Sequence, residues 1–274
     1  MKSPPNAVLI VALVGVFAGG GCAQLSAGRP TLPATHTVVR GQLVVHSEFP
    51  LAASHRLLEE LAARRFDLAH RLGLPVSEEP IHVYLFDDAN QFDNFVHLHY
   101  PGFPPRRAYF LETDTRLHVY AQWGDRVAED LRHEVTHGYL HSVVPNLPLW
   151  LDEGLAEYFE VPRGAHGLNP PHLAELVSQM ETGGRQPDLK RMEGFERPFD
   201  MTQADYAEAW AWVHFFLESG PKSRRALEQY LLDLRRDGTA EPLSERIGRH
   251  VAAPESALAD HLRSLQAGAG LAAR

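Results

Sequence analysis

Cysteine is almost absent from the 274-residue sequence, which contains only Cys22. A single cysteine excludes an internal disulfide bond and a zinc site built from cysteine ligands. Positive charge is also scarce, because 26 Lys+Arg face 35 Asp+Glu and give a formal net charge of −9. Proteins that bind nucleic acids rely on cationic contacts to phosphates, so we do not expect a nucleic-acid partner. No apolar run reaches the roughly 20 residues that a transmembrane helix needs.

The composition that remains is that of an ordinary globular protein, with 44% hydrophobic and 22% charged residues. The length fits one large domain or two small ones. Histidine is abundant, with 16 residues. Because cysteine cannot contribute, any metal chemistry must use histidine and carboxylate ligands.

The N-terminal segment has the pattern of an export signal. Residues 7–18 (AVLIVALVGVFA) form an unbroken apolar run after the positive charge of Lys2, which matches the apolar core of a secretory signal. Three glycines precede Cys22, and small residues before a lone cysteine resemble a bacterial lipoprotein signal. The resemblance implies a lipidated Cys22 at the mature N-terminus, whereas ordinary signal cleavage near Cys22 or Ala23 is the alternative. We expect an exported protein of the cell envelope, anchored to a membrane through Cys22 or otherwise periplasmic or secreted.

Hydrophobic periodicity predicts strands first and helices afterwards, which indicates an α+β fold. After the signal (1–22), residues 23–36 are small, polar and proline-containing, as in a flexible tether. We expect a mixed sheet with helices and an edge strand in 37–124, a mostly helical part in 125–266, and a disordered tail in 267–274. The predicted strands are two within 37–49, then 81–86, 108–111 and 117–122. The predicted helices are 51–72, 90–99, 126–143, 149–160, 171–182, 203–219, 222–236, 242–250 and 255–266.

The most informative stretch is His133-Glu134-Val135-Thr136-His137, an HExxH pattern. Residues four apart lie on one face of a helix, so His133 and His137 can direct ring nitrogens to one point. Zn²⁺ suits two imidazoles, one carboxylate and an open water position. Glu134 is rotated by about 100° from His133 and can reach the water rather than the metal. A solvated polar face that also includes His141 is the alternative interpretation.

A second predicted helix offers candidates for the third ligand. The short loop at 145–148 favours an antiparallel arrangement of the two helices. Residues 150–158 (WLDEGLAEY) contain Glu153 and Glu157, one helical turn apart. An exposed acidic face is the alternative for such a pair, yet both residues lie among large apolar side chains.

These two helices together resemble the gluzincin metallopeptidases, the peptidase MA-like group that includes thermolysin and aminopeptidase N. WLDEGLAEY is similar to the aminopeptidase pattern W-L-N-E-G-F-A, which implies that Glu153 is the third zinc ligand beside His133 and His137. The resemblance also implies that Glu157 accepts a hydrogen bond from a ligand histidine. Only 15 residues separate His137 from Glu153, fewer than in the relatives, so an exchange of roles between Glu153 and Glu157 stays open.

The resemblance implies a thermolysin-like fold and a metallopeptidase with one Zn²⁺, acting on peptide or protein substrates. Water bound to the zinc and activated by Glu134 would hydrolyse the peptide bond. Tyr206 resembles the later tyrosine of the clan, which donates a hydrogen bond to the oxyanion. Packing of Tyr206 with the tryptophans at 210 and 212 is the alternative, and His214 is the second candidate donor.

Gluzincins also hold the substrate backbone on an edge strand of the sheet. Residues 117–121 are the candidate for that strand, and an internal strand is the alternative. The sequence lacks the Gly-x-Met-Glu-Asn element of aminopeptidases, which favours an endopeptidase or a narrow role in the envelope. The alternative function is a non-catalytic, zinc-binding envelope lipoprotein with a structural or partner-binding role. Substrate identity and oligomeric state stay open.

Overall fold

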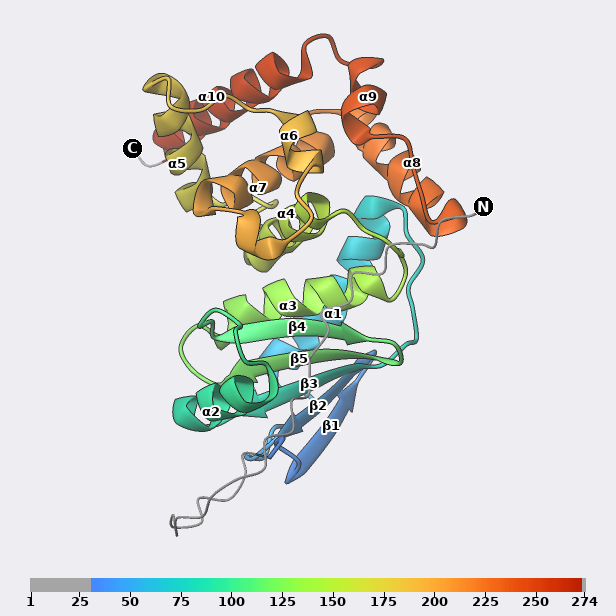
Figure 1. The fold of residues 1–274 in the computed structure, drawn as a ribbon, viewed down its shortest axis with the longest axis vertical. Helices are drawn as coiled ribbons and strands as arrows, with labels where there is room; N and C mark the ends of the chain where they lie inside the picture. Colours follow the sequence, from blue (N-terminus) through green and yellow to red (C-terminus); the bar gives the residue numbers. More distant parts are fainter. Residues whose placement is uncertain (1–30, 273–274) are drawn as a thin grey trace, which may run out of the picture.

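The computed structural model of the protein describes residues 31–272. Its fold is α+β, with a mixed sheet in the N-terminal part and ten α-helices among the described residues (Figure 1). The expected signal segment, Cys22 and most of the expected tether lie outside the described residues. Within the described part, no helix combines the length and apolarity needed to cross a membrane.

Most elements follow the periodicity of the sequence within a few residues. The strands are β1 (His36–Arg40), β2 (Leu43–Ser47), β3 (Ile81–Phe86), β4 (Ala108–Thr113) and β5 (Arg116–Gln122). The helices are α1 (Arg56–Leu72), α2 (Ala89–His99), α3 (Val127–His141), α4 (Leu149–Glu160), α5 (Pro170–Glu181), α6 (Leu189–Glu193), α7 (Gln203–Glu218), α8 (Pro221–Asp237), α9 (Leu243–Gly248) and α10 (Pro254–Ala272), with a 3₁₀ turn at Pro198–Asp200.

The sheet has five strands in the order β1-β2-β3-β5-β4. The hairpin β1–β2 is antiparallel, β2, β3 and β5 are parallel, and β4 pairs antiparallel with β5. The prediction that residues 117–121 form the edge strand is therefore wrong, because they belong to β5 inside the sheet and β4 forms the edge. Register explains the placement, since Val119 of β5 pairs with Val83 of β3 and both are fully buried.

The two faces of the sheet carry different cores. On β3, Ile81, Val83 and Leu85 belong to the main core with α1 and α3, whereas Tyr84 and Phe86 join a second aromatic cluster with residues of α2. This alternation follows from the two-residue period of a strand. Figure 1 shows α1 and α3 above the sheet and α2 on its other side.

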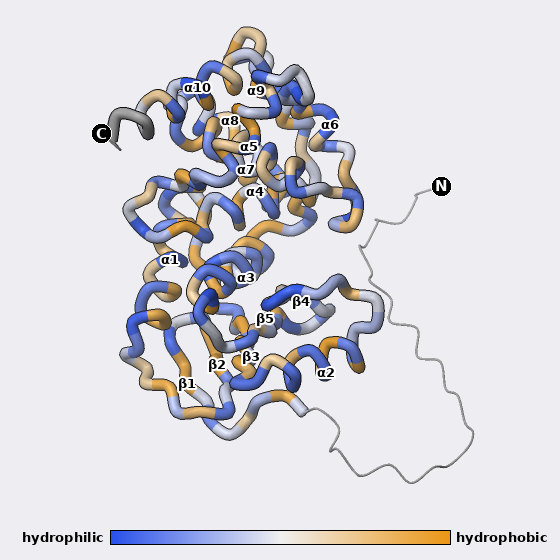
Figure 2. The backbone as a smooth tube through the Cα atoms, turned by 90° about the vertical axis from the view of Figure 1, so that its left-hand side faces the viewer, coloured by the Kyte–Doolittle hydropathy of each residue, from blue (hydrophilic) through white to orange (hydrophobic). Residues whose placement is uncertain are grey.

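The helical part is built around α7. All residues from Asp205 to Leu217 are buried, as expected for a helix that is apolar on every side. Figure 2 shows this part stacked on α3 and α1, which separate it from the sheet. The last helix, α10, continues to Ala272 and thus includes most of the tail predicted to be disordered at 267–274. Alanine, which recurs in this stretch, has the highest helix propensity.

Candidate metal centre

The candidate centre lies between α3 and α4, which run antiparallel. Near the start of α3, the Arg132 guanidinium donates to the carbonyl of Glu160 at the end of α4. Near the end of α3, His141 Nε2 lies 3.0 Å from Asp152 Oδ2 in the first turn of α4. The first part of α3 therefore contacts the end of α4, and the end of α3 contacts the start of α4. This is the antiparallel arrangement that the short connecting loop predicted.

Two glycines let these helices approach their neighbours closely. A Cβ atom at Gly138 would lie 2.9 Å from Cδ1 of Ile81 in β3, and one at Gly154 would lie 2.5 Å from the carbonyl oxygen of Ala209 in α7. Each glycine directly follows a candidate ligand, His137 or Glu153. The backbone beside each ligand is therefore fixed by close packing.

His133, His137 and Glu153 come together and could hold a metal ion. Glu153 Oε2 lies 3.5 Å from His133 Nε2 and 3.8 Å from His137 Nε2. Two nitrogen or oxygen ligands of a tetrahedral zinc ion stand about 3.4 Å apart, given bonds of about 2.0–2.1 Å. The two distances from Glu153 are thus close to that spacing, and the three ligand atoms all lie within 4.8 Å of one another.

The buried oxygen of Glu153 is a second observation that favours a cation at this place. Glu153 is only 6% exposed, and its Oε2 has no hydrogen-bond partner among the described residues. An unpaired buried carboxylate oxygen is costly. A cation between Oε2 and the two imidazoles would remove that cost, so the residues present fit a divalent ion.

The second nitrogen of each imidazole faces a carboxylate. His133 Nδ1 lies 3.1 Å from Glu160 Oε2, and His137 Nδ1 lies 2.8 Å from Asp152 Oδ1. These contacts turn both Nε2 atoms toward Glu153 and make the rings better ligands. Sequence reasoning missed Asp152 and Glu160, although their position on α4 beside Glu153 was a signal.

Glu157 occupies a different position from the one expected. Its Oε2 lies 2.7 Å from Nε2 of His172 in α5. A carboxylate oxygen of Glu157 also lies within 4.8 Å of a ring nitrogen of His133, but Nδ1 of that ring is hydrogen-bonded to Glu160. The helical period explains the difference, because residues seven apart face nearly the same direction and residues four apart are rotated by about 40°. Glu160 therefore follows Glu153 toward α3, and Glu157 turns toward α5.

Burial and charge set the protonation of the cluster. Burial lowers the pKa of His133, but the neighbouring carboxylates of Glu153 and Glu160 outweigh it and hold that pKa well above its usual value. Burial also lowers the pKa of His137, but the negative charge of Asp152 outweighs it, so that this pKa is raised as well. In Glu134, burial raises the pKa of the carboxyl, and the nearby histidines only partly oppose it. A carboxyl with a raised pKa suits proton transfer near neutral pH.

Tyr206 comes from α7 to the same region and is 7% exposed. Burial and the charge of Glu153 raise the pKa of its phenol. Its oxygen accepts a hydrogen bond of 3.1 Å from Nη2 of Arg106. Arg106 was not predicted as a site residue, and its only sequence signal was its place between the proline-rich segment and β4.

The second candidate donor, His214, has a different environment. Its Nδ1 lies 2.9 Å from Nε2 of His261 in α10, and its ring packs against Tyr158 and Trp210. Burial and the charge of His261 lower the pKa of His214 to about 4. The described contacts of His214 thus place it in the core between α7 and α10.

The edge strand β4 runs along α3. Near its start, Arg107 forms two hydrogen bonds to Asp130, of 2.9 and 2.6 Å. Further along, the ring of Phe110 stacks on that of His137 at 5.7 Å between centroids. At its end, Glu112 Oε2 lies 2.6 Å from Nδ1 of His141. The candidate metal group is therefore level with the first half of β4.

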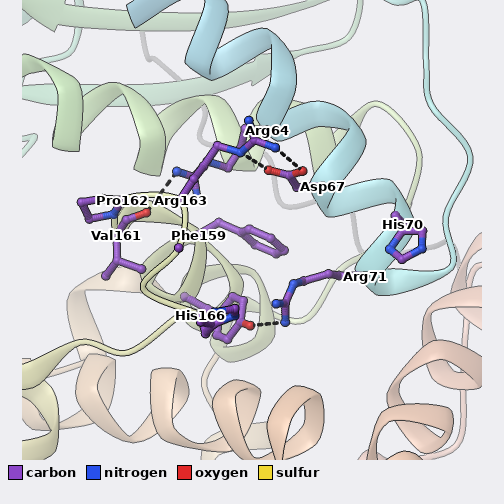
Figure 3. A pocket seen from close by; sticks show the side chains of 12 residues that line it. Arg64, Asp67, His70, Arg71, Phe159, Val161, Pro162, Arg163 and His166 are labelled. Carbon is purple, nitrogen blue, oxygen red and sulfur yellow. Dashed lines mark hydrogen bonds and ion pairs between the residues drawn. The ribbon is translucent and has the colours of Figure 1, made fainter. Parts of the chain in front are cut away.

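A separate cavity of about 460 Å³ lies between α1 and the loop after α4 (Figure 3). The Arg71 guanidinium there donates to the hydroxyl of Tyr158, at 2.6 Å, and Arg163 pairs with Asp67, at 2.7 Å. Arg71 and Arg163 are thus already engaged, and the cavity lining includes none of the three candidate ligands.

A comparison with protein-family models finds no match, and a comparison with curated proteins finds none either. The gluzincin resemblance accordingly stays a prediction from the motifs.

Proposed function

We propose that the protein is a zinc-dependent metallopeptidase of the gluzincin type, with a thermolysin-like arrangement of its site. The observation that carries the proposal is the convergence of His133 Nε2 and His137 Nε2 on the unpartnered Oε2 of Glu153. Two imidazoles and one carboxylate are a common ligand set of catalytic zinc, because they leave a coordination position open. Its substrates would be peptides or proteins in the cell envelope or outside the cell.

His133, His137 and Glu153 would hold the ion, while Glu160 and Asp152 keep the two imidazoles oriented. Bound Zn²⁺ supplies Lewis acidity, which polarises the scissile carbonyl and lowers the pKa of water toward about 7.

Glu134 would act as the proton carrier. It takes a proton from the attacking water and passes it to the nitrogen of the leaving amine. Its burial beside both histidines and its raised pKa suit both steps. It is not part of the group that could hold the metal, which leaves its carboxylate free.

Tyr206 would stabilise the negative charge that develops on the carbonyl oxygen. Arg106 donates to the phenolic oxygen, so the O–H hydrogen of Tyr206 remains free to donate to the substrate. A hydrogen bond of this kind, fixed in advance, favours the transition state over the ground state.

The exposed edge of β4 would bind the substrate backbone. Its N–H and C=O groups on the side away from β5 have no strand partner in the described sheet, so an extended peptide can pair there. Export and lipid anchoring at Cys22 complete the proposal and rest on the sequence pattern alone.

The test combines elemental analysis with cleavage of a peptide library by the purified protein. We expect one zinc ion per chain and cleavage products. Glu134→Gln should keep the zinc and lose turnover by about two to four orders of magnitude. Glu129→Gln is the matched control, since Glu129 lies in the first turn of the same helix and pairs with Arg126. Zinc without cleavage would support the structural role instead, and a fully active Glu134→Gln would exclude the mechanism.

A further inference from the structure

Arg106 is an unbalanced cation beside the candidate metal centre. Its side chain is exposed, and the Tyr206 hydroxyl is its hydrogen-bond partner. No carboxylate of the described residues forms an ion pair with it, whereas its neighbour Arg107 is paired with Asp130. A guanidinium has five N–H donors, so most of the donors of Arg106 are free to bind a ligand.

The carboxylates of the centre have partners other than Arg106. Glu153 faces the two candidate imidazoles, and Glu160 and Asp152 face their second nitrogens. The positive charge of Arg106 therefore has no paired carboxylate among the described residues. Guanidinium groups bind carboxylates through paired, charge-assisted hydrogen bonds, so an anionic group of the substrate is the complementary ligand.

The position of Arg106 relative to β4 indicates which part of a peptide it would meet. Arg106 lies two residues before the start of β4. A peptide paired antiparallel to β4 has its carboxyl end at that side, and its cationic amino end lies toward Glu112. A parallel peptide would instead place its amino group against the like charge of Arg106.

The contacts of β4 with α3 set the distance. Arg107 is level with Asp130 and Phe110 with His137, so the metal group faces the stretch between these two residues. Arg106 is therefore about two or three residues from the reacting carbonyl along the strand, or about 7–10 Å at 3.3 Å per residue. A carboxylate one or two residues beyond the scissile bond would reach it.

We propose that Arg106, held by Tyr206, binds a substrate carboxylate one or two residues on the carboxyl side of the scissile bond. This inference deepens the proposed function and rests on it. The carboxylate is either the C-terminus of a peptide or the side chain of an aspartate or glutamate. The enzyme would thus prefer peptides that carry negative charge just after the cleaved bond.

The test uses one internally quenched, mixed-sequence peptide library made in three forms: free C-terminal acids, C-terminal amides without acidic residues, and amides with Asp or Glu near the C-terminus. We expect at least one anionic form to have a kcat/KM roughly ten- to hundredfold above that of the neutral amides. Mass spectrometry should place its cleavage one or two residues before the carboxylate. The form that is preferred identifies the source of the carboxylate.

Arg106→Gln should remove the preference, and Arg107→Gln should keep it, since both variants lose one positive charge from adjacent positions. Equal rates for the three forms in the wild type, or a preference that persists in Arg106→Gln, would overturn the inference.

A binding measurement separates this inference from the proposed function. In the Glu134→Gln background, fluorescence anisotropy of labelled acid and amide peptides should show tighter binding of the acid, dependent on Arg106. If no form is hydrolysed and this Arg106-dependent difference is present, the peptidase proposal fails and the anion site stands. If hydrolysis occurs without any such difference, the anion site fails and the peptidase proposal stands.

Discussion

Asp152 supports His137 from behind, with Oδ1 2.8 Å from Nδ1 of the imidazole. Its other oxygen, Oδ2, lies 3.0 Å from Nε2 of His141, whose Nδ1 contacts Glu112 on β4. One carboxylate thus links a candidate metal ligand to the edge strand. Burial would raise the pKa of Asp152, but the two histidines hold it well below its usual value, so it stays ionised.

Asp152→Asn should weaken zinc binding by about ten- to hundredfold, because the neutral amide supports the His137 imidazole less well. Glu160→Gln should have a similar effect through His133. Competition with a fluorescent chelator measures both affinities. Glu157→Gln is the comparison, because its carboxylate bonds to His172. A larger loss in Glu157→Gln than in Asp152→Asn would return to Glu157 the supporting role that the sequence predicted.

Metal removal should lower the thermal stability of the protein. An ion that binds only the folded chain stabilises it by about 4 kcal/mol when its free concentration is a thousand times its Kd. Thermal unfolding with and without a chelator measures the difference. We expect the chelator to have little effect on Glu153→Gln, which lacks the anionic ligand. His97→Ala, exposed on α2, should respond like the wild type, and an unresponsive wild type would argue against a bound ion.

Alanine at Gly154 should destabilise the fold by about 2–3 kcal/mol, because the added methyl group would overlap the rigid backbone carbonyl of Ala209. Gly138→Ala is the matched variant. There the nearest atom is the flexible end of the Ile81 side chain, and alanine also favours the helix by up to about 1 kcal/mol. Urea unfolding should therefore give a much smaller loss for Gly138→Ala, and equal losses would contradict the close approach of α4 and α7.

The pKa of His214, lowered to about 4, predicts a loss of stability in acid. The unfolded chain takes up a proton near pH 6.5 while the folded chain resists it, so the unfolding free energy falls as pH falls from the unfolded toward the folded pKa. Between about pH 7 and about pH 5 this residue should contribute a loss of roughly 2 kcal/mol. Urea titrations of the chelator-treated wild type and His214→Asn measure it. Equal pH slopes in the two proteins would contradict the assignment.

The sequence predicted those features that depend on local patterns. The helix boundaries at 149–160 agree with α4, and the hairpin strands around 112–115 are present. Helical spacing alone was sufficient to place His133 and His137 on one face. The α+β class followed from the order of strands and helices along the chain.

Contacts between distant segments could not be predicted in this way. The edge position of β4 depends on whether β4 or β5 pairs with β3, and both strands of a hairpin can do so. The place of Arg106 beside Tyr206 joins residues 100 positions apart. Glu157 and Glu160 are both acidic residues of one helix, and only the rotation of α4 against α3 distinguishes their partners.

The two glycines next to His137 and Glu153 have a consequence for how specificity can be altered. Behind both ligands the main chain packs closely, against the Ile81 side chain at Gly138 and against the Ala209 carbonyl at Gly154. Residues of β4 other than Phe110 and Glu112, which contact His137 and His141, can therefore be exchanged to redirect selectivity while the coordinating atoms keep their mutual spacing, which makes this strand the natural target for re-engineering.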